Sequence, residues 1–312
     1  MITRRDIAST HLVIAPYLRV TPVVDVRIAG IREPVSLKLE LLQHTGSFKA
    51  RGAFANLLTG QTPERVTAAS GGNHGAAVAY AAKALGVEAR IFVPRISNAE
   101  KLARIRSYGA EVVQDGERYD DARKLAAAYA AESGAADIHA YDSEATILGQ
   151  GTLAREFEEQ SPDLDTVIAA VGGGGLIGGI AGWYGGGIRV VGVETQGCAA
   201  LHAALAARKP VPVEVSGRAA DSLGARQIGE LPFGIAASHV EQSLLVSDED
   251  VRRAQLWLWD NLRLITEPGG ATAFAALLSG AWKPGEQERV GVVVCGANVS
   301  PDHFAESLKP SA

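Results

Sequence analysis

The sequence predicts an α/β protein with two open, twisted, parallel-sheet lobes and a ligand-binding cleft between them. Short β-branched runs alternate with Ala-rich helical stretches through most of the chain, and strands separated by helical segments of about 10–15 residues are typical of βαβ units. The length of 312 residues fits one large domain or two ordinary ones. Because ligands in open α/β sheets bind at the carboxyl ends of the strands, we expect the functional site where two such sheets face each other.

The predicted elements follow from hydrophobic periodicity. Seven short apolar runs are predicted to be strands, namely Val35–Leu39, Arg65–Ala69, Ala89–Val93, Glu111–Val113, Thr166–Val171, Arg189–Glu194 and Arg289–Val294. Helical patterns between or after them predict helices over Ala76–Leu85, Asp121–Ser133 and Val251–Asn261. The stretch Arg65–Tyr141 is therefore expected to be a compact βαβαβα block.

Capping residues mark helix starts at four places. Ser97–Glu100 has the pattern of a capping box, and Ser247–Asp250 is its aspartate variant. Thr62–Pro63 and Ser300–Pro301 each pair a capping hydroxyl with proline at the first helical position. We expect a helix to begin at each of these sites.

Composition argues against several functional classes. The 30 basic and 35 acidic residues give a net charge of −5 without a long run of one sign, so nucleic-acid binding is not expected. No apolar stretch reaches the roughly 18 residues of a membrane span, and the N-terminus lacks the apolar core of a signal peptide. Cys198 and Cys295 are the two cysteines, too few for a disulfide framework or an unaided zinc site, so we expect a protein of the reducing cytoplasm.

The first stretch that carries chemistry is Thr45–Ala53. Gly46 and Ser47 favour a turn and a helix start, so Lys49 is predicted to lie in the first helical turn. A cation there faces the positive end of the helix dipole. Lys49 is either an exposed surface lysine or an amine kept neutral enough to react with an aldehyde, and this stretch alone leaves both possibilities open.

Two further stretches join a predicted strand to a helix through glycines. In Ala69–Ala76, a Ser-Gly-Gly-Asn turn places free backbone N–H groups at a helix start, which suits an amino-acid carboxylate or serves only as a tight turn. His74 within it is more typical of a packed structural histidine than of a base. In Val171–Gly179, the run Gly172–Gly175 allows the backbone to wrap a phosphate at the N-terminus of the next helix.

The last stretch also fits a different class of enzyme. Gly173, Gly175 and Gly178 satisfy the G-x-G-x-x-G pattern of dinucleotide-binding proteins. Glu194 ends the next predicted strand, where a ribose-binding carboxylate is expected. An NAD-linked dehydrogenase is therefore an alternative, although the motif lies in the middle of the chain and this alternative leaves the other two stretches unexplained.

Together, these stretches and the segment Val294–Asn298 resemble the fold-type II pyridoxal-phosphate (PLP) enzymes, specifically the serine/threonine dehydratase and serine racemase group. The similarity covers nearly the whole chain. It implies a tryptophan synthase β-like fold with a discontinuous large domain, residues 1–52 and 142–312, and a small domain, residues 53–141. It also implies PLP as cofactor, an amino acid as substrate and a homodimer, and it leaves a divalent or monovalent cation open.

The resemblance assigns roles to residues at matching positions. Lys49 matches the Schiff-base lysine, Phe48 the residue that packs on the ring, and Asn73 the residue that hydrogen-bonds the 3′-oxygen of PLP. The substrate carboxylate is implied to bind the turn and its neighbours, Ser70, Gly71, Gly72, Asn73 and His74. The phosphate is implied to bind Gly172, Gly173, Gly174 and Gly175, and the other cofactor-side residues are Glu267, Cys295 and Asn298.

Cys295 matches the residue that faces the pyridine nitrogen. A thiol with a pKa of about 8.5 is mostly neutral at pH 7, so it does not hold that nitrogen protonated as an aspartate would. A ring that withdraws electrons less strongly favours β-elimination over transamination, and cysteine at this position resembles the liver-type serine dehydratases. A buried structural cysteine is the alternative.

Two positions depart from the pattern of the group. Racemases carry a serine, a second acid/base, where this chain has Gly71, so Lys49 is implied to be the only base and elimination is favoured over racemisation. Metal-dependent members use a glutamate that matches Glu194 and an aspartate at the position of Ala200. The metal site is therefore incomplete or rebuilt with Asp221, and we assign no metal ligand.

We therefore predict a PLP-dependent ammonia-lyase that eliminates water from a small β-hydroxy amino acid, such as L-threonine or L-serine, to give a 2-oxo acid and ammonia. Alternatives of the same family are an amino-acid racemase, a 3-hydroxyaspartate dehydratase and a β-replacement synthase. Alternatives of other classes are the NAD-linked dehydrogenase and a non-catalytic amino-acid-binding module. With 312 residues, we expect no regulatory C-terminal domain.

Overall fold

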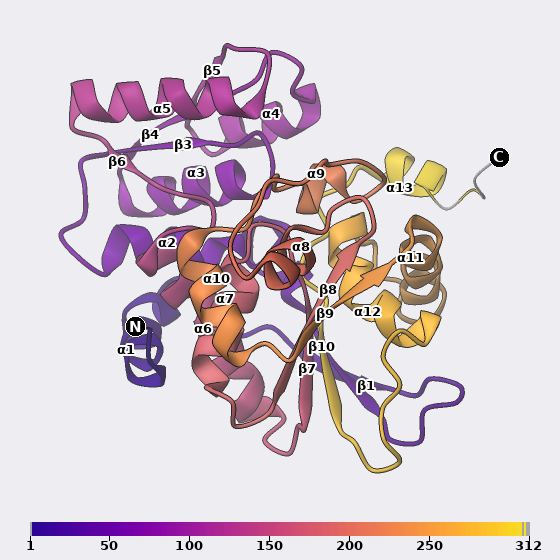
Figure 1. Ribbon diagram of the computed structural model, residues 1–312. Coiled ribbons are helices and arrows are strands. Elements are labelled where there is room, and N and C mark those ends of the chain that lie inside the picture. Colours follow the sequence, from indigo (N-terminus) through magenta and orange to yellow (C-terminus); the bar gives the residue numbers. More distant parts are fainter. Residues whose placement is uncertain (1, 308, 310–312) are drawn as a thin grey trace.

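The computed structural model describes residues 2–307 and 309, and within them the strands form two sheets (Figure 1). The larger sheet has the order β1-β2-β10-β7-β8-β9, and all its neighbours are parallel except β1 and β2. Its strands are β1 (Val23–Val26), β2 (Val35–Lys38), β7 (Thr166–Ala170), β8 (Arg189–Thr195), β9 (Gln242–Val246) and β10 (Val290–Val293). The smaller sheet is wholly parallel, in the order β5-β4-β3-β6, with β3 (Arg65–Ala69), β4 (Glu88–Val93), β5 (Glu111–Gln114) and β6 (Ala136–Asp137). The predicted two-lobed α/β fold is confirmed.

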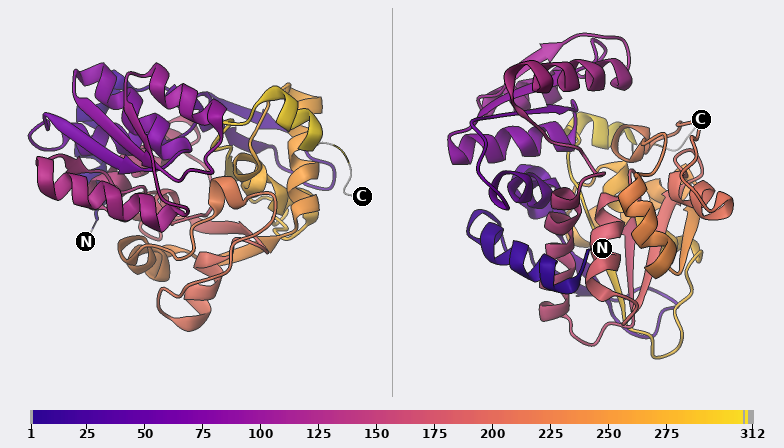
Figure 2. Two further views of the ribbon diagram at one scale, coloured as in Figure 1. Left: turned by 90° about the horizontal axis from the view of Figure 1, so that it is seen from above. Right: turned by 60° about the vertical axis from the view of Figure 1, so that its left-hand side comes forward.

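Helices cover both faces of each sheet. They are α1 (Arg4–Ile14), α2 (Lys49–Leu58), α3 (Asn73–Leu85), α4 (Ala99–Ser107), α5 (Tyr119–Ser133), α6 (Glu144–Gln160), α7 (Gly175–Tyr184), α8 (Ala200–Ala207), α9 (Ala220–Leu223), α10 (Glu230–His239), α11 (Asp248–Leu262), α12 (Pro268–Ser279) and α13 (Pro301–Ser307), with the 3₁₀ turns η1 (Ala15–Tyr17), η2 (Glu40–Leu42) and η3 (His44–Gly46). In Figures 1 and 2, α3 and α5 lie on opposite faces of the smaller sheet, and α7 and α12 on opposite faces of the larger one. None of the described helices combines the length and apolarity that crossing a membrane requires.

Each sheet has its own apolar core, and α2 lies between the two. Every residue of β7 is buried, as expected for a parallel strand covered on both faces. The α2 residues Phe54 and Leu57 belong to the core of the smaller sheet, whereas the same helix also packs on α6. The helix therefore connects the two lobes. The predicted domain boundaries at residues 52/53 and 141/142 stay a prediction.

The seven predicted strands are all present, and their ends differ from the prediction by at most one residue. Three strands were not predicted, β1, β6 and β9, and each lies at the edge of its sheet. An edge strand pairs on one side only, so its residues need less of the continuous apolar pattern that marks a central parallel strand.

Three of the four predicted helix starts are confirmed, and only the one at Thr62–Pro63 is missing. Ser247 forms the capping box of α11, and α13 begins at Pro301. At Ser97–Glu100 the helix α4 begins at Ala99, but the predicted capping residue is wrong. Ser97 N–H closes a turn onto Pro94 O, and Asn98 caps the helix by accepting from Glu100 N–H at 2.8 Å. The start at Thr62–Pro63 is also wrong, since this segment leads without a helix into β3.

A buried ion-pair network anchors α2 two residues after Lys49. Arg51 donates from Nε to Glu40 Oε2 at 2.8 Å and from Nη2 to Glu156 Oε2 at 3.0 Å. Lys38 Nζ donates to the other oxygen of Glu156 at 2.5 Å. Burial raises the pKa of Glu156, but Arg51 and Lys38 outweigh this and hold it below its usual value. Two cations and two anions, all buried, thus fix α2 onto β2 and α6.

Candidate active site

Lys49 is the first residue of α2, and the segment before it is joined to the end of β10. Ser47 pairs with Gly296 in an isolated antiparallel bridge, and Phe48 N–H donates to Cys295 O at 3.2 Å. These bonds hold the start of α2 beside Cys295. The predicted position of Lys49 in a first helical turn is confirmed.

The Lys49 amine is largely withdrawn from water. Its Nζ donates to Ala140 O at 2.7 Å and lies 5.1 Å from the centre of the Phe48 ring. Burial lowers the pKa of Lys49 to about 8, although the side chains of Cys295 and Glu267 oppose this shift. A substantial neutral fraction near physiological pH is what a nucleophilic or basic lysine requires.

The glycines Gly172–Gly175 connect β7 to α7. Gly174 caps α7 with a φ of +95° and offers no side-chain bond, so the first N–H groups of this ten-residue helix remain for an anion. A Cβ built on Gly173 would lie 2.2 Å from the Tyr141 ring, so only glycine admits this ring. Tyr141 directly follows Ala140, whose carbonyl oxygen accepts the hydrogen bond from Lys49 Nζ. The same short segment therefore contacts both the lysine amine and the glycine loop.

Asn73, Glu267 and Asn298 come from three distant parts of the chain and meet beside the turn that precedes Lys49. Asn73 Nδ2 donates to Glu267 Oε1 at 2.6 Å, and Asn298 Nδ2 donates to Asn73 Oδ1 at 2.5 Å. Burial raises the pKa of Glu267 to about 7, although the bond from Asn73 opposes the shift. The structure thus brings together the three polar side chains that the resemblance assigned to the cofactor side.

Cys295 is buried at the end of β10. Its thiol donates to Gly269 O at 3.4 Å, and burial raises its pKa far above the usual range. The side chain is therefore a neutral thiol, which carries no negative charge with which to hold a ring nitrogen protonated.

The Ser70–His74 turn presents backbone rather than side chains. Gly72 N–H donates to Ser70 Oγ at 3.2 Å, which closes the turn. His74 is buried, donates from Nε2 to Ile138 O at 2.9 Å, and burial lowers its pKa to about 3. It is thus a neutral, packed histidine, as the sequence suggested, and this bond leaves its Nε2 unable to contact a substrate carboxylate.

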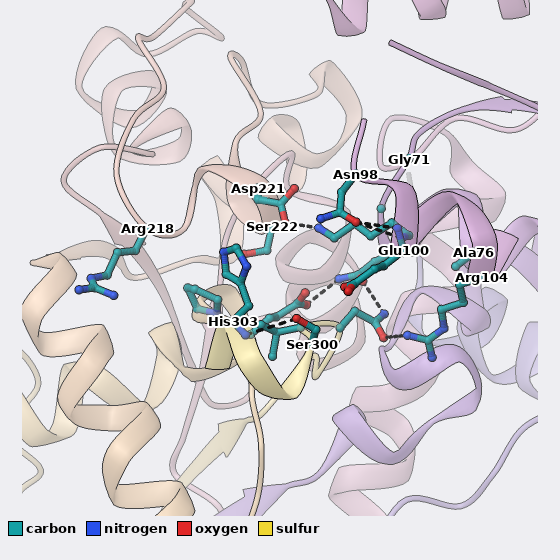
Figure 3. Close-up of a pocket in the computed structure, with 17 residues that line it drawn as sticks. Gly71, Ala76, Asn98, Glu100, Arg104, Arg218, Asp221, Ser222, Ser300 and His303 are labelled. Atoms are coloured by element: carbon teal, nitrogen blue, oxygen red, sulfur yellow. Dashed lines mark hydrogen bonds and ion pairs between the residues drawn. The ribbon is translucent and has the colours of Figure 1, made fainter. Parts of the chain in front are cut away.

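A cavity of about 410 Å³ adjoins these residues on the α4 side (Figure 3). Gly71 and Gly72, which precede α3, and Ser222 of α9 are among the residues that line it. Lys101 of α4 forms an ion pair with Asp221 of α9, so the cavity is bridged from one lobe to the other. Asp221 therefore pairs with a lysine here, and the suggestion that it rebuilds a metal site beside Glu194 gains no support.

Glu194 is fully buried and has a structural role. Its Oε1 accepts from Leu201 N–H at 2.8 Å, and its Oε2 accepts from His202 N–H at 2.7 Å and from the Ser243 hydroxyl at 2.6 Å. The carboxylate thus binds the first N–H groups of α8. With both oxygens engaged, it is not free for the ribose of a dinucleotide, which argues against the dehydrogenase alternative.

Sequence reasoning missed four residues of this region, Lys101, Arg104, Tyr141 and Ser222. Lys101 and Arg104 look like the solvent-facing side of an ordinary amphipathic helix, and only the approach of the other lobe gives them partners. Tyr141 belongs to no motif. The sequence indicates it only indirectly, because glycine at position 173 leaves the space that the Tyr141 ring occupies.

The whole chain resembles PLP enzymes. The sequence profile of the family described as "Pyridoxal-phosphate dependent enzyme" matches residues 14–296. The phenylserine dehydratase of Ralstonia pickettii is 37% identical, over 97% of this chain and 95% of the relative. An L-threonine ammonia-lyase of Thermotoga maritima is 34% identical, over 85% of this chain and 67% of the relative.

Solved structures agree in fold. A threonine deaminase of T.th. superposes with a TM-score of 0.89 at 34% identity and covers 96% of this chain and 99% of its own. Maize serine racemase superposes with a TM-score of 0.91 at 31% identity and covers 98% of this chain and 96% of its own. A threonine deaminase and a serine racemase thus share this backbone.

Proposed function

The chain belongs to the pyridoxal-phosphate dependent enzymes, and on that premise we propose that it is an ammonia-lyase acting on a small β-hydroxy amino acid. The reaction removes water, and the product hydrolyses to a 2-oxo acid and ammonia. The observation that carries the proposal is the desolvated Lys49 amine beside the glycine loop. The names of the phenylserine, threonine and serine relatives support the substrate class.

The residues fit the cofactor. PLP supplies an aldehyde and an electron-withdrawing ring that stabilises negative charge at the substrate Cα. Lys49 would carry it, the N–H groups of Gly172–Gly175 and α7 would bind its phosphate, and Asn73 and Cys295 would face its ring. Ser47 Oγ, two residues before Lys49, is buried and has no hydrogen-bond partner among the described residues. A buried polar group of this kind is available for a bond to a bound cofactor.

The chain's own groups divide the work of the reaction. The Ser70–Asn73 turn binds the substrate carboxylate, and Lys49 Nζ takes the proton from Cα. Gly71 has no side chain to return a proton to the opposite face of Cα, so reprotonation there is disfavoured. The β-hydroxyl would instead leave as water, with the proton that Lys49 has taken from Cα. Cys295 would lie at the ring nitrogen of the cofactor, and its neutral thiol has no negative charge with which to keep that nitrogen protonated, which would favour β-elimination over transamination.

The test is a 2-oxo-acid assay with L-serine, L-threonine, 3-hydroxyaspartate and phenylserine, after the absorbance spectrum of the purified protein has been recorded. We expect the absorbance of an imine between Lys49 and the cofactor near the violet edge of the visible spectrum, which we call the visible-edge band. We also expect 2-oxo acid from at least one of the four amino acids, and recovered substrate of unchanged configuration. Enantiomer formation without 2-oxo acid would identify a racemase instead. Product that needs an added nucleophile would identify a synthase, and bound nicotinamide a dehydrogenase.

Uptake of PLP by the apoprotein is expected to depend on pH through Lys49. Only the neutral amine reacts with an aldehyde, and with a pKa of about 8 its neutral fraction rises roughly tenfold between pH 7 and pH 9 and then levels off. Ionisation of Glu267 in this range broadens the curve, because it favours the ammonium form. The rate is followed by absorbance, with Nα-acetyl-lysine as the control for the cofactor's own titration. A rate that still rises steeply above pH 9 contradicts a lowered pKa.

We further propose a cytoplasmic homodimer. Both cysteines are free thiols, as expected in a reducing compartment. Leu12 and Val20 are 77% and 75% exposed, with Val13, Tyr17 and Leu42 also exposed nearby, and such an apolar patch suits a second copy of the chain. Light scattering should give twice the chain mass of 32.6 kDa, and a Leu12→Glu, Val20→Glu variant should give the chain mass itself. A monomeric wild-type protein rules the dimer out.

A further inference from the structure

Asn73 lies in a continuous line of hydrogen bonds that begins at Arg104. Arg104 Nη1 donates to Asn298 Oδ1, and the dashed line at Arg104 in Figure 3 marks this bond. Asn298 Nδ2 donates to Thr45 O at 2.8 Å and to Asn73 Oδ1 at 2.5 Å. Asn73 Nδ2 donates to Glu267 Oε1 at 2.6 Å. The line joins α4 of the smaller lobe to the turn before Lys49 and to the N-termini of α3 and α12.

The direction of these bonds is fixed by the groups at the ends. A guanidinium has donors and no acceptor, so Asn298 must turn its oxygen to Arg104. A backbone carbonyl only accepts, so Thr45 O requires the amide nitrogen of Asn298 on the other side. The two requirements agree, and the orientation of the Asn298 amide therefore follows from the chemistry of its neighbours.

The orientation of Asn298 in turn fixes that of Asn73. Because Asn298 offers a hydrogen, Asn73 must present its oxygen there and its nitrogen to Glu267. That nitrogen carries two hydrogens, and the bond to Glu267 uses one. We propose that Arg104, acting through Asn298, is a positioning residue that makes Asn73 present an N–H donor, and not its carbonyl oxygen, to the 3′-oxygen of the cofactor. This inference rests on the proposed function, which places that oxygen at Asn73.

The turn before Lys49 is shaped to allow this arrangement. Thr45 and Gly46 have φ values of +62° and +74°, and the left-handed region is costly for threonine. A Cβ on Gly46 would lie 2.7 Å from Asn298 Oδ1. Glycine at 46 thus admits the Asn298 oxygen, and the bond from Asn298 to Thr45 O is one of the contacts that holds the strained turn.

The decisive variant is Asn298→Asp, with PLP affinity measured on the apoprotein and the absorbance spectrum on the PLP-loaded protein. Aspartate keeps the partner of Arg104 and turns the contact into an ion pair, but it has no hydrogen to donate to Asn73 or Thr45. We expect at least a tenfold weaker binding of PLP to the apoprotein and a decrease of the absorbance near the visible edge relative to shorter wavelengths. The melting temperature is measured alongside, because the variant also removes the bond to Thr45 O. Arg104→Met should change both readouts in the same direction, and Arg104→Lys, which remains a donor-only cation, should restore them towards wild type.

Arg106→Met is the matched control, since Arg106 lies on the same helix, is exposed and donates at 3.3 Å to Gln114 at the end of β5, within the smaller lobe. It should leave the spectrum and PLP affinity unchanged. If Asn298→Asp behaves as wild type, Arg104 merely holds the lobes together and the inference is overturned. It is also overturned if Asn298→Asp is impaired while Arg104→Met is not, because Asn298 then acts without Arg104. A wild-type protein that never develops the visible-edge band refutes the proposed function itself.

Discussion

Lys49→Ala is expected to abolish both the visible-edge absorbance of the protein and its formation of 2-oxo acid. The variant removes the amine that would carry the cofactor and the base that would take the Cα proton, and loss of such a base alone costs about 10²–10⁴-fold in rate. With the covalent anchor also lost, we expect a decrease of at least about 10³-fold. The methyl group that remains fits the first turn of α2, because alanine is a good helix former, so the fold should be retained.

Lys83→Ala is the matched control for this experiment. Lys83 is an exposed lysine in the last turn of α3, and its Nζ donates only weakly, at 3.3 Å, to Ser107 O. Its loss should leave absorbance and turnover as in the wild type. Retention of the visible-edge band by Lys49→Ala, measured at equal protein concentration, would show that another lysine carries the cofactor.

Arg51→Met is expected to lower the free energy of unfolding by about 3–5 kcal/mol, the cost of leaving a buried charge uncompensated. Arg51 is fully buried and bonds both Glu40 and Glu156. Methionine fills much of the volume but leaves Lys38 as the one cation of the network for two buried carboxylates. Urea denaturation of the apoprotein measures the effect without a contribution from bound cofactor.

The control for Arg51 is Arg155→Met on α6. Arg155 bonds Glu159 one helical turn away at 2.6 Å, in a pair whose carboxylate side is exposed to solvent. Such exposed pairs contribute about 0–1 kcal/mol, so this variant should unfold close to the wild-type midpoint. Equal losses for the two variants would mean that burial of the Arg51 network adds nothing to stability.

The central strands of both sheets were predictable because the residue pattern that marks each of them lies within a few adjacent positions. A run of β-branched residues such as Thr166–Ala170 is buried on both faces and indicates a strand wherever it occurs. The glycines after it and the position of Lys49 at a helix start are likewise properties of a few adjacent residues. The edge strands β1, β6 and β9 carry weaker patterns and needed their sheet neighbours to be recognised.

Contacts between distant residues were beyond this kind of reasoning. Glu156 lies in a charged helical stretch that looks solvent-exposed, and only the fold brings it to Arg51, 105 positions away. Asn298 and Glu267 entered through the resemblance, but their bonds to Asn73 depend on three loops meeting. The resemblance therefore named these residues, and the geometry was required to say what each one does.

The segment Ala140–Asp142 has a mechanical consequence. The chain crosses here from the smaller sheet to the larger one. Ala140 O accepts from Lys49 Nζ, and the Tyr141 ring packs against Gly173. The Asp142 carboxylate accepts from Glu230 and Leu231 N–H at the start of α10. Three consecutive residues thus hold the crossing between the lobes, and two of them, Ala140 and Tyr141, contact the Lys49 amine and the glycine loop directly. The spacing of these two neighbours therefore fixes how far the amine lies from the phosphate-binding loop.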